Sequence, residues 1–198
     1  TDLSRAVVIG FPERMLTAEQ LASLAGMVDR RSRREPISRI LGRREFWSLS
    51  FEVGPATLDP RPDSETLVSA VLARVEDRAA ELSLLDLGTG TGCLLLALLS
   101  ELPHAEGTGV DISGDAIEVA RRNADALGLR RRSRFLVDDW ARHVTGGFDI
   151  VISNPPYIES DAIAGLSTEV AVFDPRAALD GGSDGLEGNG RIAHCDCS

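Results

Sequence analysis

Short apolar runs alternate with longer amphipathic segments through most of the chain. The apolar runs lie at residues 82–87, 108–112, 134–137 and 149–153, and helical periodicity is found at residues 63–80, 93–102 and 115–127. Strands that are apolar almost throughout are typical of parallel sheets buried on both faces. The pattern therefore predicts an α/β domain with a parallel sheet covered on both faces.

The first part of the chain follows a different pattern. Residues 13–34 have the leucine and valine spacing of a helix, and Thr17 and Gln20 are placed to form a capping box at its start. Residues 45–58 alternate apolar and polar positions and contain a Gly-Pro turn signal at residues 54–55, which predicts a β-hairpin. Residues 181–190 are rich in glycine and are expected to form a loop.

Charge is distributed unevenly over the 198 residues, whose net charge is −10. Residues 1–44 contain nine arginines and five acidic residues, a balance of +4, and the remainder contains twelve arginines and twenty-six acidic residues, a balance of −14. The acidic second part argues against direct nucleic-acid binding. No apolar stretch reaches the ~18 residues of a membrane span and no signal peptide is recognisable, so we expect no membrane partner and a cytoplasmic location.

The cysteines suggest neither a disulfide framework nor a metal site. There are three of them in total, too few for a disulfide-stabilised fold. His194, Cys195 and Cys197 are residue types that bind metals, but they have no second ligand pair elsewhere in the sequence. We therefore expect no metal.

A glycine-rich loop follows the first apolar run and precedes a helix. It consists of Gly88, Thr89, Gly90, Thr91 and Gly92, with Asp86 just before it. Glycines let the backbone turn sharply and let a ligand come close, and the N–H groups of the next helix favour a polar ligand. NAD-binding folds use the spacing G-x-G-x-x-G. The G-x-G-x-G spacing after an acid is the form that S-adenosylmethionine (SAM)-binding domains use, although this loop alone leaves an NAD-dependent oxidoreductase open.

The ends of the next two apolar runs carry candidate nucleoside contacts. Asp111 lies about 20 residues after the loop, where a carboxylate can accept both ribose hydroxyls; a helix-capping role is the alternative. Asp139 can accept a hydrogen bond from the adenine amino group, and the indole of Trp140 can pack on the purine. A strand-end turn with a core tryptophan is the alternative for this pair.

The fourth run ends in Asn154-Pro155-Pro156-Tyr157. Two prolines keep the backbone rigid, so the Asn154 side-chain oxygen and the Pro155 carbonyl can accept the two N–H bonds of a planar NH2 group. The Tyr157 ring can stack on that plane. Since a sulfonium is a strong methyl donor, positioning and electrostatic stabilisation are enough for catalysis. The motif predicts SAM-dependent methyl transfer to a planar nitrogen, with Asn154, Pro155 and Tyr157 as catalytic residues.

At these residues the chain resembles the HemK/PrmC family, the protein-(glutamine-N5) methyltransferases that act on peptide chain release factors. The resemblance covers about residues 33–192 and extends beyond the general methyltransferase motifs. It includes Pro-Arg-Pro-Asp-Ser-Glu at residues 60–65 and Phe-Asp-Pro-Arg at residues 173–176. It implies a Rossmann-like class I SAM-dependent methyltransferase sheet preceded by a short helical segment and a β-hairpin.

The resemblance also implies a division of the chain and roles for the motifs. Residues 1–34 would be the remnant of an N-terminal helical substrate-binding domain, residues 35–62 a linker and hairpin, and residues 63–198 the SAM-binding catalytic domain. Residues 88–92, Asp111 and Trp140 would bind SAM, and Asn154 would contact both cofactor and substrate. Pro155, Pro156 and Tyr157 would complete the pocket for the glutamine of a Gly-Gly-Gln loop. Arg61 would line the approach to the site.

The sequence departs from the family pattern at several positions. Arg39 stands where an aromatic residue is usual, and Asp59 where an aliphatic one is usual. Residues 187–198 match poorly, and we expect the last strands of the sheet to be absent. The run at residues 149–153 would then be an open apolar edge, so we expect self-association through this edge or marginal stability.

Other acceptors remain open at this point. DNA adenine or cytosine amino-methyltransferases and RNA guanine-N2 methyltransferases share the Asn-Pro-Pro-Tyr motif. A ribosomal-protein glutamine methyltransferase is a nearer relative, but residues 62–65 favour the release-factor branch. A catalytically inactive fragment that binds SAM is the remaining alternative.

Overall fold

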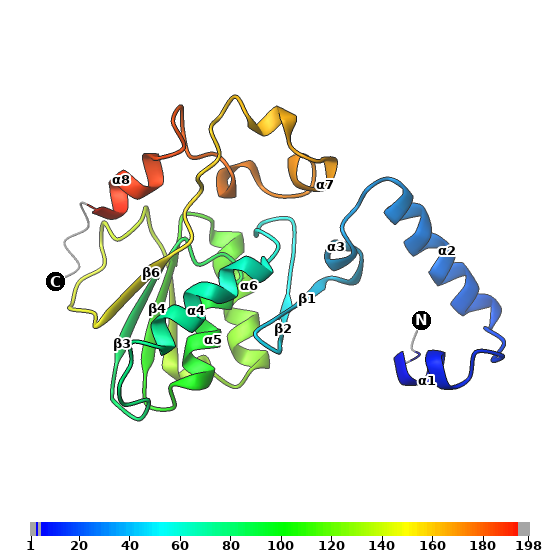
Figure 1. The fold of residues 1–198 in the computed structure, drawn as a ribbon, viewed down its shortest axis with the longest axis horizontal. Coiled ribbons are helices and arrows are strands. Elements are labelled where there is room, and N and C mark those ends of the chain that lie inside the picture. Colours follow the sequence, from blue (N-terminus) through cyan, green and yellow to red (C-terminus); the bar gives the residue numbers. More distant parts are fainter. Residues whose placement is uncertain (1–2, 4, 194–198) are drawn as a thin grey trace.

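The structure is a computed structural model that describes residue 3 and residues 5–193. Its centre is a four-stranded parallel sheet of order β5-β4-β3-β6 (Figure 1). The strands are β3 (Ser83–Leu87), β4 (Glu106–Asp111), β5 (Ser133–Val137) and β6 (Ile150–Ser153). Among the described residues, β6 pairs only with β3, so its outer side is a free edge. The expected α/β fold with a parallel sheet is confirmed.

Three helices pack on one face of this sheet: α4 (Glu65–Leu72), α5 (Cys93–Glu101) and α6 (Gly114–Ala126). They bury the main hydrophobic core, in which α5 is enclosed along residues 94–99. Ser113 caps α6, because its side chain accepts a hydrogen bond from the Ala116 N–H at 3.2 Å. The helix then ends before Gly128, whose left-handed φ of 70° suits a helix stop.

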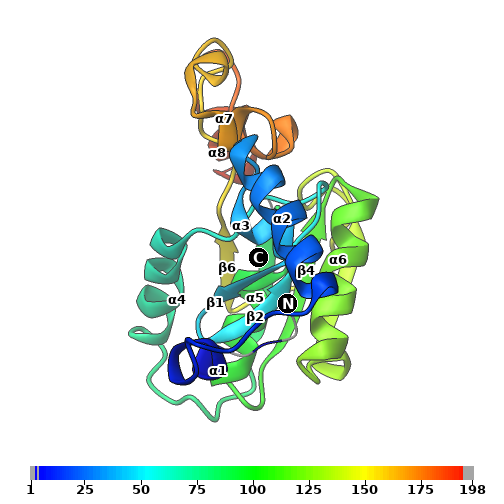
Figure 2. The same cartoon turned by 90° about the vertical axis from the view of Figure 1, so that its right-hand side faces the viewer.

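The other face of the sheet is covered by less regular structure. Leu85, Leu87 and Val110 form its core, and Trp140 and Ile192 are among the residues that pack on them. Ile192 belongs to α8 (Glu187–Ala193), which lies with α7 (Thr168–Ala171) beyond the carboxyl ends of the strands (Figures 1 and 2). The remaining short helices are η1 (Pro62–Ser64), η2 (Arg130–Arg132), η3 (Ile163–Gly165) and η4 (Arg176–Ala178).

The N-terminal helices lie beside the sheet domain and extend away from it (Figure 1). They are α1 (Arg5–Gly10), α2 (Ala18–Ser32) and α3 (Ile37–Leu41). The predicted capping box at Thr17 and Gln20 is present at the start of α2. None of the residues of α2 is buried, and its Leu21, Leu24 and Val28 are exposed. The apolar positions that predicted this helix therefore do not belong to the core.

The hairpin links these helices to the sheet domain, but its turn is not where the sequence placed it. Its strands are β1 (Arg43–Phe46) and β2 (Leu49–Glu52), so Trp47 and Ser48 form the turn, with φ of 52° and 58°. Two-residue hairpin turns of this left-handed kind match the twist of the strands. Positions with positive φ in such turns usually hold Gly, Asn or Asp, so Trp47 and Ser48 gave no turn signal and the Gly-Pro pair at residues 54–55 was misleading.

Two further expectations were wrong in detail. The helix expected over residues 63–80 is a turn of 3-10 helix followed by α4, which ends at Leu72. The glycine-rich residues 181–190 were expected to be a loop, but α8 begins at Glu187. Tertiary packing explains a glycine at position 188 of this helix, because a Cβ there would lie 3.0 Å from the Cβ of Pro155.

Across the described residues, no helix is both long and apolar enough to cross a membrane. His194, Cys195 and Cys197 lie outside the described residues.

Candidate functional site

A cavity of about 540 Å³ opens where the parallel strands end. Because the carboxyl ends of parallel strands meet at one edge of the sheet, the loops after β3, β4, β5 and β6 all reach it. Its lining brings together most of the predicted site residues, namely Gly88, Thr89, Gly90, Thr91, Asp111, Asp139, Trp140, Asn154 and Pro156.

Three predicted site residues lie next to this lining and are not part of it. Gly92 precedes α5, and a Cβ on it would lie 3.2 Å from Leu96, so its small size serves helix packing. Pro155 packs against Gly188 of α8. Tyr157 is 66% exposed, so the stacking of its ring on an acceptor group stays a prediction.

Asp111, the last residue of β4, is hydrogen-bonded to the glycine-rich loop. Its Oδ2 accepts a hydrogen bond from the Gly90 N–H at 2.8 Å, and its Oδ1 accepts one from the Ser113 N–H at 2.9 Å. Burial raises the pKa of this carboxyl, although these backbone bonds oppose the shift. A carboxylate accepts about four hydrogen bonds in all, so Asp111 retains acceptor capacity toward the cavity.

Asp86 lies behind the loop and is fully buried. Its Oδ2 accepts a hydrogen bond from Thr89 Oγ1 at 2.7 Å, whereas its Oδ1 has no partner among the described residues. Burial raises the pKa of Asp86 to about 7, and the nearby charge of Asp111 contributes in the same direction. A positive charge bound in the adjacent cavity would favour the ionised form of this carboxyl.

Asn154 contributes a side-chain amide from the end of β6. Its Nδ2 donates to Ser64 Oγ at 3.4 Å. Because the nitrogen is engaged in this way, the side-chain oxygen is the acceptor left for a ligand. Ser64 also lines the cavity, and the residue 60–65 motif therefore supports the end of the fourth strand.

Helix α8 supplies part of the wall that the sequence did not indicate. Glu187, Gly188 and Arg191 line the cavity. Arg191 Nη1 donates to both carboxylate oxygens of Asp139, at 3.0 and 3.2 Å. Asp139 thus already has a charged partner, and its predicted bond to an adenine amino group would share the carboxylate with Arg191. This wall was missed from the sequence because residues 187–192 match the family pattern poorly and the glycines of residues 181–190 predicted a loop.

The cavity lining carries more negative than positive charge. Its acidic side chains are Asp111, Asp115, Asp138, Asp139, Asp180 and Glu187, and its basic ones are Arg61 and Arg191. Six carboxyl groups against two guanidinium groups favour a ligand with a positive charge. Pro60, Pro175, Ala177 and Ala178 complete the apolar part of the opening.

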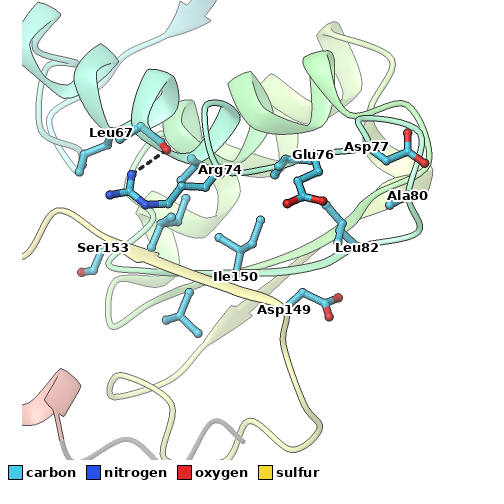
Figure 3. A pocket seen from close by; sticks show the side chains of 14 residues that line it. Leu67, Arg74, Glu76, Asp77, Ala80, Leu82, Asp149, Ile150 and Ser153 are labelled. Atoms are coloured by element: carbon cyan, nitrogen blue, oxygen red, sulfur yellow. Dashed lines mark hydrogen bonds between the residues drawn. The ribbon is translucent and has the colours of Figure 1, made fainter.

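A second hollow, of about 730 Å³, lies beside the free edge of β6 and contains none of the predicted site residues (Figure 3). Its walls come from α4, the segment after it, and residues 149–153. Within the part of the chain that the structure describes, no group of three or more His, Cys, Asp or Glu side chains is placed to hold a metal ion.

Comparison with known families agrees with the fold. Residues 62–183 match the family model of the methyltransferase small domain. The match covers most of the chain, and the fold and site therefore define a methyltransferase of the small-domain class. Residues 1–42 match the PrmC N-terminal domain. The chain belongs to the HemK/PrmC family within this class.

Relatives with curated names support this membership. A release factor glutamine methyltransferase of Rhodospirillum rubrum is 54% identical over 93% of this chain and 56% of its own length. One of Agrobacterium fabrum is 47% identical over 88% of this chain and 62% of its own length. The chain thus spans less than two thirds of these relatives.

A solved structure shares the fold at low sequence identity. The catalytic domain of hMettl16, solved with the MAT2A 3'UTR hairpin 6, matches with a TM-score of 0.61 over 76% of this chain and 57% of its own. The two are 17% identical, so the likeness concerns the fold alone.

Proposed function

We propose that the protein methylates the side-chain nitrogen of a glutamine with SAM as the methyl donor, and that the acceptor is the Gly-Gly-Gln loop of peptide chain release factors. The observation that carries the proposal is the shared cavity. Asn154 and Pro156 of the acceptor motif line the same space as Gly88–Thr91 and Asp111 of the cofactor motif. The names of the relatives and the PrmC N-terminal match at residues 1–42 support the choice of acceptor.

The residues present fit SAM. Gly88 and Gly90 have left-handed φ of 72° and 55°, and an added Cβ would meet no atom within 4 Å at either one, so the loop leaves room for a ligand at its surface. Asp111 retains acceptor capacity for ribose hydroxyls, and the acidic lining favours a cation. SAM supplies an electrophilic methyl group on a positively charged sulfur when bound.

The chain's own residues would act mainly by positioning. The Asn154 side-chain oxygen accepts one N–H of the glutamine amide, and the Pro155 carbonyl accepts the other. These two bonds fix the plane of the amide and direct the nitrogen lone pair into the cavity. They also stabilise the positive charge that grows on the nitrogen as its bond to the methyl group forms. The bond between the methyl group and sulfur would break as the new bond forms, and the nitrogen would lose one proton to water. The products would be a neutral N5-methyl amide and S-adenosylhomocysteine.

Labelled SAM tests the proposal when it is offered with each of four acceptors: a release factor, its Gln→Ala loop variant, ribosomal protein and DNA. Label on the wild-type factor alone is the expected result. Label on ribosomal protein or DNA would show that the acceptor is that molecule and not a release factor. Absence of label together with measurable SAM binding would identify a fragment that binds SAM without turnover.

A further inference from the structure

A buried cluster of charges is centred on Asp174 and reaches the cavity through Arg61. The Asp174 side chain is 2% exposed. Its Oδ1 accepts hydrogen bonds from Arg39 Nη2 at 2.9 Å and from the Asp59 N–H at 3.4 Å, and its Oδ2 accepts one from Arg61 Nη2 at 2.5 Å. The cluster therefore joins α3, the segment after the hairpin, and the segment that follows α7.

The two residues that depart from the family pattern, Arg39 and Asp59, both belong to this cluster. Arg39 is 6% exposed and also donates to the carbonyls of Gly54 and Thr57. Asp59 accepts a hydrogen bond from Ser38 Oγ at 2.8 Å. Three guanidinium groups face the two carboxylates, because Arg44 Nη1 also lies 3.7 Å from Asp59 Oδ2. Arg39 thereby gives Asp174 a second positive partner, and Asp59 pairs with Arg44.

Two buried polar atoms of the cluster, Arg39 Nε and Asp59 Oδ1, lack hydrogen-bond partners among the described residues. Buried ion pairs seldom stabilise a fold more than apolar packing of the same volume, and buried polar atoms without partners add a cost. A cluster with these costs is better explained by the position that it imposes on a side chain at its border.

Arg61 is that border residue. It is the one arginine of the cluster that lines the cavity, and its side chain is 38% exposed. Pro175, next to Asp174 in the sequence, also lines the cavity, and Ser64, three residues after Arg61, accepts a hydrogen bond from the amide nitrogen of Asn154. Asp174 thus fixes Arg61 relative to the residue on which acceptor binding is proposed to depend.

We propose that Asp174 is a positioning residue that holds the Arg61 guanidinium at the cavity mouth, where its remaining N–H groups bind a backbone carbonyl of the acceptor loop. A guanidinium has five N–H donors, and the bond to Asp174 uses only part of them. Because Arg61 is paired with Asp174 and the cavity lining is mostly acidic, its exposed N–H groups suit a neutral carbonyl better than a phosphate or a carboxylate. The identity of the acceptor rests on the proposed function, whereas the positioning of Arg61 does not.

Guanidinium NMR tests the positioning without any need for activity. In the wild-type chain the side-chain N–H signals of Arg61 should be sharp and protected, because the bond to Asp174 slows rotation of the group. Asp174→Asn should average and broaden them, and signals that remain unchanged in this variant would overturn the positioning. If Asp174→Asn fails to fold because Arg39 loses its partner, the double variant Arg39→Met with Asp174→Asn keeps the test open.

Enzyme kinetics test whether Arg61 binds the acceptor loop. With a Gly-Gly-Gln peptide as acceptor, Arg61→Met should raise the acceptor KM about tenfold or more, which corresponds to one lost hydrogen bond to a charged group. The SAM Kd should change less than twofold, and Arg61→Lys should recover part of the KM. Arg78→Met is the matched control, because Arg78 also pairs with a carboxylate, that of Glu101, but lies outside the cavity lining.

The outcomes separate the two proposals. An unchanged KM in Arg61→Met, or the same change in Arg78→Met, would overturn the recognition by Arg61. If the wild type transfers no methyl group to any acceptor, the proposed function fails and carbonyl recognition fails with it. The NMR result still decides in that case whether Asp174 positions Arg61.

Discussion

Side chains at the strand ends differ in how fully their hydrogen bonds are satisfied. Both carboxylate oxygens of Asp111 accept backbone N–H groups, Asp86 has one oxygen without a partner among the described residues, and Asn154 has its nitrogen engaged by Ser64. These differences decide whether a substitution at each position should affect folding, cofactor binding or methyl transfer.

Asn154→Ala should impair methyl transfer far more than SAM binding. It removes the acceptor proposed to hold the glutamine amide, and loss of one such positioned group typically lowers kcat by about 10²- to 10³-fold. The SAM Kd should rise less than about tenfold, the equivalent of one hydrogen bond. Single-turnover transfer and calorimetry measure the two effects. Ser64→Ala is the control, because it removes the partner of Asn154 and leaves the acceptor oxygen in place. Transfer within threefold of wild type in Asn154→Ala would contradict the proposed role.

Asp86 should make the free protein less stable as the pH rises. Its pKa is about 7 in the folded chain and about 3.9 in an unfolded one, so the folded state binds the proton more tightly. The contribution of Asp86 to the free energy of unfolding therefore falls between about pH 4 and pH 7 and is level above that range.

Asp86→Asn removes this dependence and isolates it. The variant should be more stable than wild type at pH 8, by about 1 to 4 kcal/mol, because each tenfold difference in proton affinity between the folded and unfolded chains corresponds to about 1.4 kcal/mol. The two proteins should differ little in stability at pH 4. Urea unfolding of both proteins at the two pH values measures the difference. A stability gap that is the same at pH 4 and pH 8 would show that Asp86 titrates normally.

At the level of elements, β4 lets the glycine-rich loop pack closely on the sheet. A Cβ on Gly109 would lie 2.7 Å from the Phe135 ring and 2.8 Å from Thr89 Oγ1. Thr89 in turn binds Asp86. Gly109 in β4 thus allows the glycine-rich loop after β3 to lie beside the cavity.

Gly109→Ala should accordingly destabilise the fold and disturb the loop. Overpacking of this kind typically costs about 1 to 3 kcal/mol, and displacement of Thr89 should weaken SAM binding as well. Thermal unfolding and calorimetry measure the two effects. Gly147→Ala is the matched control, because a Cβ there meets no atom within 4 Å and its stability should stay within about 0.5 kcal/mol. Equal effects of the two substitutions would exclude the proposed packing.

The sequence predicted the elements well where local pattern and tertiary packing agree. The parallel strands were expected within two residues of their observed bounds. The agreement is best explained for β3, which is buried along residues 84–87 and is apolar there except for Asp86. The turn at Trp47, the early end of α4 and the start of α8 were not expected. Long-range contacts act on two of them: the Trp47 N–H donates to Glu65, and Gly188 lies close to Pro155 and Trp140.

The same distinction holds for the site. Four strand-end motifs could be placed around one cavity because strand order brings them together. The sequence could not show that Arg191 already binds Asp139, because the residues lie 52 positions apart. Nor could it show that Arg39 and Asp59, noticed only as departures from the family pattern, meet around Asp174.

At the scale of the whole molecule, the outer edge of β6 has no neighbouring strand among the described residues. Its residues 149–153 and the facing side of α4 leave an apolar hollow between them. Figure 3 shows Arg74 toward the Ser153 end of this hollow and Asp77 and Asp149 toward the other end. An antiparallel pair of such edges, related by a two-fold axis, would place opposite charges against each other.

We therefore predict that this chain self-associates through the β6 edge. Unpaired backbone groups on an apolar edge strand readily accept a second strand, and a charged side chain on the edge opposes such pairing. Val151, which is 42% exposed on this strand, is the position to test. Sedimentation at rising concentration should show association of the wild type, and Val151→Lys should shift it to monomer. Val28→Lys is the matched control, because Val28 is an exposed valine of α2 far from this edge in sequence. Dissociation by Val28→Lys alone would assign the contact to the N-terminal helices, and a wild type that stays monomeric at every concentration would refute the prediction.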